Sequence, residues 1–176
     1  MIRKIQYFWL GFFLLGANAR SEEIPHLFSV ASGVYDFTRP QHMSAEFDLE
    51  LKFHAKGLKS PNRYLEFRPL LGAMGTLKGT IYVYLGINFD LLFADHFLIA
   101  PGFAAGYYSK GGGKDLGYPI EFRSGVEFAW QFSDWRRLGV HFYHLSNARL
   151  GKKNPGEESL VLFYDIPIKE GFPFYR

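Results

Sequence analysis

The sequence contains no cysteine, so neither disulfide bonds nor thiolate chemistry can contribute to its stability or activity. A strong charge of one sign is also missing, because 20 lysine and arginine residues are nearly balanced by 17 aspartate and glutamate residues. The net charge of +3 includes Arg3 and Lys4, which lie in a predicted cleaved segment, so the mature chain carries only +1. This balance gives no argument for a nucleic-acid partner, and we predict none.

Long apolar runs are confined to the beginning of the chain. Arg3 and Lys4 precede an apolar run over residues 7–16, and the small residues Ala-Asn-Ala follow it. This order is typical of a secretory signal peptide, whereas a membrane-spanning helix needs about 20 apolar residues. We therefore predict a cleaved signal peptide over residues 1–19 and a single domain over residues 20–176.

The rest of the chain is rich in period-two alternation. Residues 45–53 carry apolar side chains at every odd position and charged side chains at every even position, and residues 120–131 alternate in the same way. Alternating segments of about ten residues, separated by turns, are typical of a transmembrane β-barrel. Eight such segments are predicted, over residues 28–37, 45–53, 64–73, 80–88, 96–107, 120–131, 137–146 and 158–168.

The predicted fold is therefore all-β, an eight-stranded antiparallel transmembrane β-barrel of the outer membrane of a Gram-negative cell. A soluble barrel or sandwich would also alternate, but its apolar rows would lie inside. The aromatic content of 19% favours the membrane barrel, because tyrosine and tryptophan gather at membrane interfaces. Inward charges such as Glu50, Lys52 and Arg123 are then expected to pair across the interior, since unpaired buried charge is costly.

The topology of such a barrel assigns each connection to one side of the membrane. An even number of strands places both chain ends in the periplasm and the longer connections outside. The predicted external connections are residues 38–44, 74–79, 108–118 and 147–157. The end of the strand over 137–146 and the start of the strand over 158–168 then lie at the level of the outer leaflet, which consists of lipopolysaccharide.

Three polar residues are predicted on the lipid-facing side at this level. His144 and Ser146 are two positions apart, close enough along a strand for their side chains to hydrogen-bond, and they share the parity of the apolar residues before them. A serine hydroxyl becomes nucleophilic when a neighbouring base takes its proton. Glu158 is expected across the hairpin on the same face, where it would orient the imidazole, whereas Glu157 has the opposite parity and is expected to point inward or into the loop.

The sequence around these residues resembles a known family. The segment His-Leu-Ser-Asn-Ala at 144–148, then Asn-Pro-Gly at 154–156, Glu158, and a closing strand that ends in Tyr-Asp-Ile-Pro-Ile at 164–168 are similar to the PagL-type lipid A 3-O-deacylases. One departure is the tail over 169–176, because such barrels usually end in an aromatic residue and this chain has Tyr175 in the penultimate position.

The resemblance implies a function and roles for individual residues. The family releases the ester-linked acyl chain at the 3-position of lipid A, without a metal or another cofactor. Ser146 would be the nucleophile, His144 the general base, Glu158 the orienting acid and Asn154 a donor of the oxyanion hole. Further donors near the site are Asn147 and the backbone at Gly156.

Substrate contacts are predicted from the same placement. The expected substrate is the lipid A part of lipopolysaccharide in the surrounding outer-membrane lipid. The outward apolar residues expected to carry its acyl chain are Phe122, Val140, Phe142 and Leu160. The rim cations, for which contact with lipid A phosphates competes with ordinary loop charge, are Lys110, Lys114, Arg149, Lys152 and Lys153.

Three other functions fit parts of the sequence. A non-enzymatic structural or adhesion barrel of the outer membrane would share every feature except the polar residues on the lipid-facing side. A phospholipase-like barrel enzyme would share the polar residues but act on glycerophospholipids. A soluble periplasmic β-barrel would need the apolar rows inside.

Overall fold

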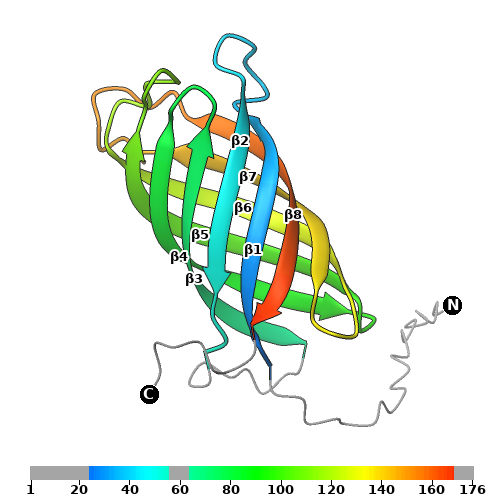
Figure 1. Cartoon of the computed structure of the whole chain (residues 1–176). Helices are drawn as coiled ribbons and strands as arrows, with labels where there is room; N and C mark the ends of the chain where they lie inside the picture. The colour runs from blue at the N-terminus through cyan, green and yellow to red at the C-terminus, as the bar shows by residue number, and fades with distance from the viewer. Residues whose placement is uncertain (1–23, 56–63, 169–176) are drawn as a thin grey trace, which may run out of the picture.

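The computed structural model describes residues 24–55 and 64–168, and they form one closed antiparallel β-barrel (Figure 1). Each strand pairs with its neighbours in chain order, and β1 pairs with β8 to close the barrel. The described residues contain no helix long and apolar enough to cross a membrane, a finding that concerns helices alone. The strands are β1 (His26–Tyr35), β2 (Ser44–Lys52), β3 (Leu65–Thr76), β4 (Ile81–Phe93), β5 (Phe97–Ser109), β6 (Ile120–Gln131), β7 (Arg137–Ser146) and β8 (Glu157–Ile168).

The prediction of an eight-stranded antiparallel barrel is thus confirmed, while some strand ends differ from the expected ones. β4 continues to Phe93 instead of ending at residue 88, because its last residues pair with the beginning of β5. The predicted signal peptide over 1–19 and the tail over 169–176 lie outside the described residues, so both remain predictions.

The barrel is apolar outside and charged inside. In β2 the side chains of Phe47 and Leu49 are exposed, whereas the alternating Glu46, Asp48 and Glu50 are buried. This arrangement follows directly from the period-two pattern, because successive side chains of a strand point to opposite faces. It is the arrangement typical of a transmembrane barrel, and it is the reverse of a soluble one.

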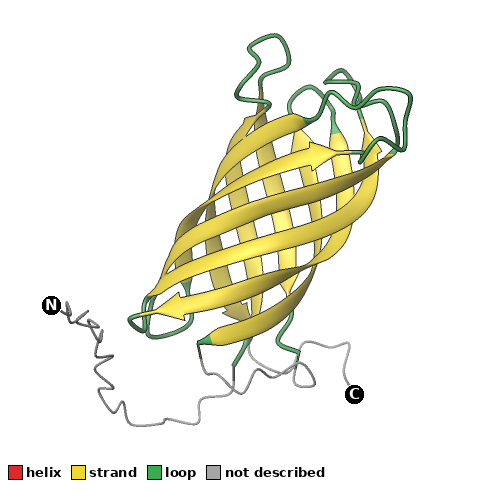
Figure 2. Ribbon diagram, turned by 180° about the vertical axis from the view of Figure 1, so that it is seen from behind, coloured by secondary structure: helices red, strands yellow, loops and turns green. Residues whose placement is uncertain are grey.

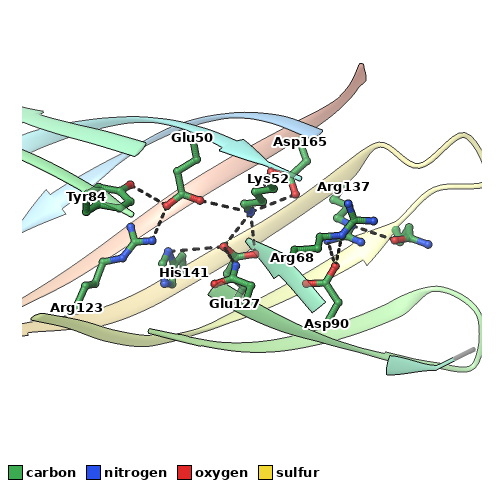
Figure 3. Close-up of polar contacts among 12 residues, drawn as sticks. Glu50, Lys52, Arg68, Tyr84, Asp90, Arg123, Glu127, Arg137, His141 and Asp165 are labelled. Carbon is green, nitrogen blue, oxygen red and sulfur yellow. Dashed lines mark hydrogen bonds and ion pairs between the residues drawn. The ribbon is translucent and has the colours of Figure 1, made fainter. Parts of the chain in front are cut away.

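Buried charges pair across the interior (Figure 3). The Lys52 ammonium lies 2.9 Å from a carboxylate oxygen of Glu127 and 3.3 Å from one of Asp165. The Arg123 guanidinium lies 2.6 Å from the Glu50 carboxylate. A second group of buried charges joins Arg68 and Arg137 to Asp90, each at 2.7 Å. The predicted pairing is therefore present for Glu50, Lys52, Arg123 and Glu127, and it offsets the desolvation of these ions. The same pairing was expected for Glu46 and Asp48, but among the described residues they are buried without an ion pair, and Glu46 instead accepts a hydrogen bond of 2.6 Å from the Ser159 hydroxyl.

The connections divide between the two ends of the barrel. One end, at the top of Figures 1 and 2, carries the connections 36–43, 77–80, 110–119 and 147–156. The opposite end carries the connections 94–96 and 132–136, together with the beginnings of β1 and β3 and the ends of β2 and β8. Because β1 and β8 are neighbours, the connection 36–43 lies beside the beginning of β8.

Candidate active site

His144 and Ser146 face outward near the end of β7. Buried and exposed residues alternate along the strand, with His141, Tyr143 and Leu145 buried and the predicted pair partly exposed. On one side, β6 places Ser124 opposite His144 and Phe122 opposite Ser146. The parity argument therefore places both side chains on the face that the sequence predicted.

Glu158 meets His144 across the hairpin that joins β7 and β8. The two residues are register partners, and the imidazole Nδ1 lies 3.2 Å from the carboxylate Oε1. Their side chains are 39% and 22% exposed, so the pair lies at the surface of the barrel wall. Glu157 is buried on the inner face, where its carboxylate accepts a hydrogen bond of 3.0 Å from Ser159. The structure thus pairs the imidazole with Glu158 and turns Glu157 away.

The orientation of the ring leaves one nitrogen for a nucleophile. A carboxylate only accepts hydrogen bonds, so in the neutral imidazole Nδ1 carries the proton and Nε2 presents its lone pair. Among residues 24–55 and 64–168, no hydrogen bond joins the Ser146 hydroxyl to His144. The expected contact is therefore not made in this structure. Side chains two positions apart stand side by side, and catalytic hydrogen bonds often tighten only when the substrate binds.

The second oxygen of the Glu158 carboxylate is held by the connection 36–43. Its Oε2 accepts a hydrogen bond of 2.6 Å from the Thr38 hydroxyl and lies 3.5 Å from a guanidinium nitrogen of Arg39. Reasoning from the sequence missed both residues, because more than a hundred positions separate them from Glu158. The available signal was barrel closure, which makes β1 and β8 neighbours.

Asn147 does not have the role predicted for it. Its Nδ2 group donates to the backbone oxygens of Leu116 at 2.8 Å and Lys153 at 2.9 Å, and its Oδ1 accepts from the backbone of Arg149 at 2.9 Å. The side chain is fully buried. Both amide hydrogens are occupied by loop carbonyls, so the Asn147 side chain is not available as an oxyanion donor and instead joins the connections 110–119 and 147–156.

Asn154 and Gly156 remain near the predicted site. The Asn154 Oδ1 accepts a hydrogen bond of 3.0 Å from the Asn147 backbone N–H. Asn154 is exposed, and its Nδ2 group is the end of the amide that can donate hydrogen bonds. Gly156 packs directly on the imidazole, and a methyl group there would collide with Cε1 of His144 and lie 3.0 Å from Nε2. Its φ of +61° also favours glycine.

An apolar strip adjoins the polar residues on the outer wall. Val140, Phe142 and Leu160 are exposed, and Phe142 and Leu160 are register partners across β7 and β8. Phe122 is partly buried and stacks on Phe103 with 5.9 Å between the ring centroids. The residues predicted to carry an acyl chain thus lie below and beside His144 and Ser146 on the same surface.

The predicted rim lysines differ in their surroundings. Lys152 and Lys153 are exposed in the connection 147–156, and the Lys153 ammonium lies 2.8 Å from the Asp115 carboxylate. That hydrogen bond lowers the pKa of the Asp115 carboxyl. Lys114 is not a rim residue, because its ammonium is buried and lies 2.9 Å from the Asp36 carboxylate. Its placement on the rim was therefore wrong.

A comparison with protein families connects this geometry to a known group. The family model described as lipid A 3-O-deacylase (PagL) matches residues 34–167, which is most of the chain. The chain belongs to the lipid A 3-O-deacylase family. The matched residues include the connection 36–43, all of β2 to β7 and nearly all of β8, so membership rests on seven of the eight strands and not only on the segment around Ser146.

A curated protein sequence and a solved structure, both named PagL, are similar to this chain. The lipid A deacylase PagL of Pseudomonas aeruginosa is 37% identical over 67 residues, which are 38% of this chain and 39% of that protein. The match thus spans about two fifths of the length of the curated relative. The crystal structure of the outer membrane enzyme PagL superposes with a TM-score of 0.64 at 22% identity, covering 81% of this chain and 99% of the other. This likeness shows a shared fold.

Proposed function

We propose that the chain is an outer-membrane serine esterase that removes the ester-linked acyl chain at the 3-position of lipid A. The observation that carries the proposal is the outward-facing hydrogen bond between His144 and Glu158, with Ser146 beside it on the same apolar surface. Polar residues on a lipid-facing surface are costly and call for a functional reason. Membership of the lipid A 3-O-deacylase family supports the choice of substrate.

In the first half of the reaction, the Ser146 oxygen attacks the carbonyl carbon of the acyl ester, and Nε2 of His144 takes the hydroxyl proton. Glu158 holds Nδ1 of the ring and stabilises the positive charge that the imidazole acquires. The tetrahedral intermediate then breaks its bond to the sugar oxygen, and His144 returns the proton to that oxygen. The deacylated lipid A leaves, and the acyl chain stays on Ser146 as an ester.

In the second half, water replaces the sugar hydroxyl. His144 takes a proton from the water, the resulting hydroxide attacks the acyl-enzyme, and the fatty acid leaves as Ser146 regains its proton. In both halves the negative oxygen of the intermediate needs hydrogen-bond donors. Asn154 and the backbone at Gly156 are the proposed donors, since the Asn147 side chain is occupied by loop carbonyls.

The proposed location follows from the barrel and from the predicted signal peptide over residues 1–19. With both ends of the barrel sequence in the periplasm, the connections around the site face the outside, and the site meets the outer leaflet. The scissile chain would lie along Phe122, Val140, Phe142 and Leu160. Lys152 is exposed in the connection 147–156 and is proposed to contact a lipid A phosphate.

Mass spectrometry of lipid A tests the proposal. Cells that express the wild-type chain should lose one 3-linked acyl chain, and cells that express Ser146→Ala should retain it. Loss of the chain in both samples, or in neither, would contradict the proposal. A fluorophosphonate probe should label Ser146 of the wild type, whereas a purely structural barrel would remain unlabelled. Release of fatty acid from glycerophospholipids in preference to lipid A would identify a phospholipase-like enzyme instead.

A further inference from the structure

The connection 36–43 continues the ladder between β1 and β8 beyond the ends of both strands. The Phe37 backbone N–H donates to the carbonyl oxygen of Glu158 at 3.0 Å. This bond brings the next two side chains to the carboxylate of Glu158, where Thr38 and Arg39 both approach Oε2. Oε1 faces His144 at 3.2 Å. The two oxygens of one carboxylate thus have separate partners, His144 of β7 at Oε1 and two residues of the connection 36–43 at Oε2.

Arg39 is itself held in place. One guanidinium nitrogen, Nη1, lies 3.2 Å from the carboxylate of Asp36 and 3.2 Å from the backbone oxygen of Gly156. An arginine side chain that is 42% exposed ordinarily samples several rotamers. Here two fixed acceptors and the Glu158 carboxylate surround the same nitrogen, so the charged group has a defined position.

Asp36 is fixed from inside the barrel. Its carboxylate is buried and lies 2.9 Å from the ammonium of Lys114, a residue of the connection 110–119. The backbone oxygen of Lys114 accepts a hydrogen bond of 2.7 Å from the Tyr108 hydroxyl. Charges of alternating sign therefore run from the interior to the outer wall, in the order Lys114, Asp36, Arg39 and Glu158, and end at the imidazole.

We propose that Arg39 is a positioning residue of the esterase site. Together with Thr38 it fixes the far oxygen of Glu158, so that the near oxygen stays directed at His144. The proposal rests on the proposed function and adds a requirement to it. A terminal carboxylate torsion is otherwise broad, and a displacement of about 1 Å in a catalytic group can cost about a hundredfold in rate.

A different role for Arg39 would be direct contact with an anionic group of the substrate. The structure favours positioning, because one guanidinium nitrogen, Nη1, is already surrounded by Asp36, Glu158 and the oxygen of Gly156. The two roles predict different kinetics. A positioning residue acts on kcat, whereas a residue that binds the substrate through its charge acts mainly on KM.

The test compares purified, refolded full-length variants on lipid A in detergent micelles. Arg39→Gln should lower kcat about tenfold with KM changed by less than about twofold, because Thr38 still holds part of the carboxylate. Thr38→Val should lower kcat by a similar factor. Arg39→Lys, which keeps a cation near the same three acceptors, should restore kcat to within about threefold of the wild type. Arg136→Gln, at the opposite end of the barrel, is the matched control and should leave kcat and KM unchanged.

Each other outcome decides against the proposal or is resolved by a second variant. Unchanged kcat in both Arg39→Gln and Thr38→Val would overturn it, and so would a rise in KM at constant kcat. If Arg39→Gln does not fold, as judged by heat-modifiable migration on gels, the decision rests on Thr38→Val, which removes one hydroxyl group.

Failure of the proposed function has a different signature, since the wild type and Ser146→Ala would then be equally inactive. The positioning claim is in that case decided by the ¹⁵N NMR signal of the His144 imidazole. Arg39→Gln should weaken the hydrogen bond at Nδ1, and an unchanged signal would overturn the claim.

Discussion

Replacing Glu158 with glutamine separates the charge of this side chain from its shape. Glutamine can still accept a hydrogen bond from Nδ1 of His144, but it cannot stabilise the imidazolium that the proposed reaction forms when Ser146 loses its proton. The variant should therefore fold as the wild type does and react more slowly.

The size of the effect follows from the geometry of the pair. Two unit charges 3.2 Å apart interact by about 1.3 kcal/mol in bulk water and by about 5 kcal/mol at an effective dielectric constant of about 20. Because the imidazole and the carboxylate are 39% and 22% exposed, the interaction lies between these limits. A loss of about 3 kcal/mol of transition-state stabilisation corresponds to a decrease in kcat on the order of a hundredfold.

The assay is the release of fatty acid from purified lipid A in detergent micelles, measured at saturating substrate. Glu157→Gln is the matched control, because residue 157 is adjacent in sequence and buried on the opposite face of β8. Its kcat should stay within about threefold of the wild type. The reasoning is refuted if Glu158→Gln keeps wild-type activity, or if both variants lose activity equally.

Three further predictions concern a glycine, the interior and a loop. Gly156→Ala should lower kcat at least about tenfold with the barrel intact, because the new methyl group would displace the imidazole. An unchanged kcat would show that the ring does not need this space. Lys52→Met leaves the buried carboxylates of Glu127 and Asp165 without their cation. It should lower the free energy of unfolding in urea by about 3–5 kcal/mol. The control variant Lys78→Met, at an exposed residue, should lower it by less than about 0.5 kcal/mol. The Lys153 hydrogen bond lowers the pKa of Asp115, so the contact stabilises the loops at neutral pH and is lost as the pH falls through that lowered pKa. Carboxyl ¹³C NMR should show the pKa of Asp115 rising toward its ordinary value in Lys153→Met, while the backbone hydrogen bond from Gly117 still holds it partly lowered.

Local patterns predicted the barrel because the deciding information is short-range. Alternation in residues 45–53 is enough to tell the inner face from the outer one, since side chains of a strand alternate strictly. The same rule distinguished Glu158 from Glu157 and placed Ser146 on the lipid-facing side. Strand ends were harder, because β4 is extended by pairing with β5 and not by a pattern of its own.

The contacts that the sequence did not reveal are those made by loops. Asn147 was expected to be available as a donor, yet its amide is used by carbonyls of Leu116 and Lys153 from two different connections. Lys114 was expected among solvated rim charges, yet it reaches inward to Asp36. Loop backbones have no fixed side-chain parity, so their geometry depends on tertiary contacts that a single sequence does not specify.

The position of the proposed esterase site on the outer wall changes which concentration controls the proposed reaction. Val140, Phe142 and Leu160 are exposed on the outer surface of the barrel beside His144. A lipid that reaches this surface arrives by diffusing sideways within its own leaflet. The encounter rate then depends on the number of lipid molecules per unit area, and diluting the substrate with inert detergent at constant total lipid A should slow an enzyme of this design.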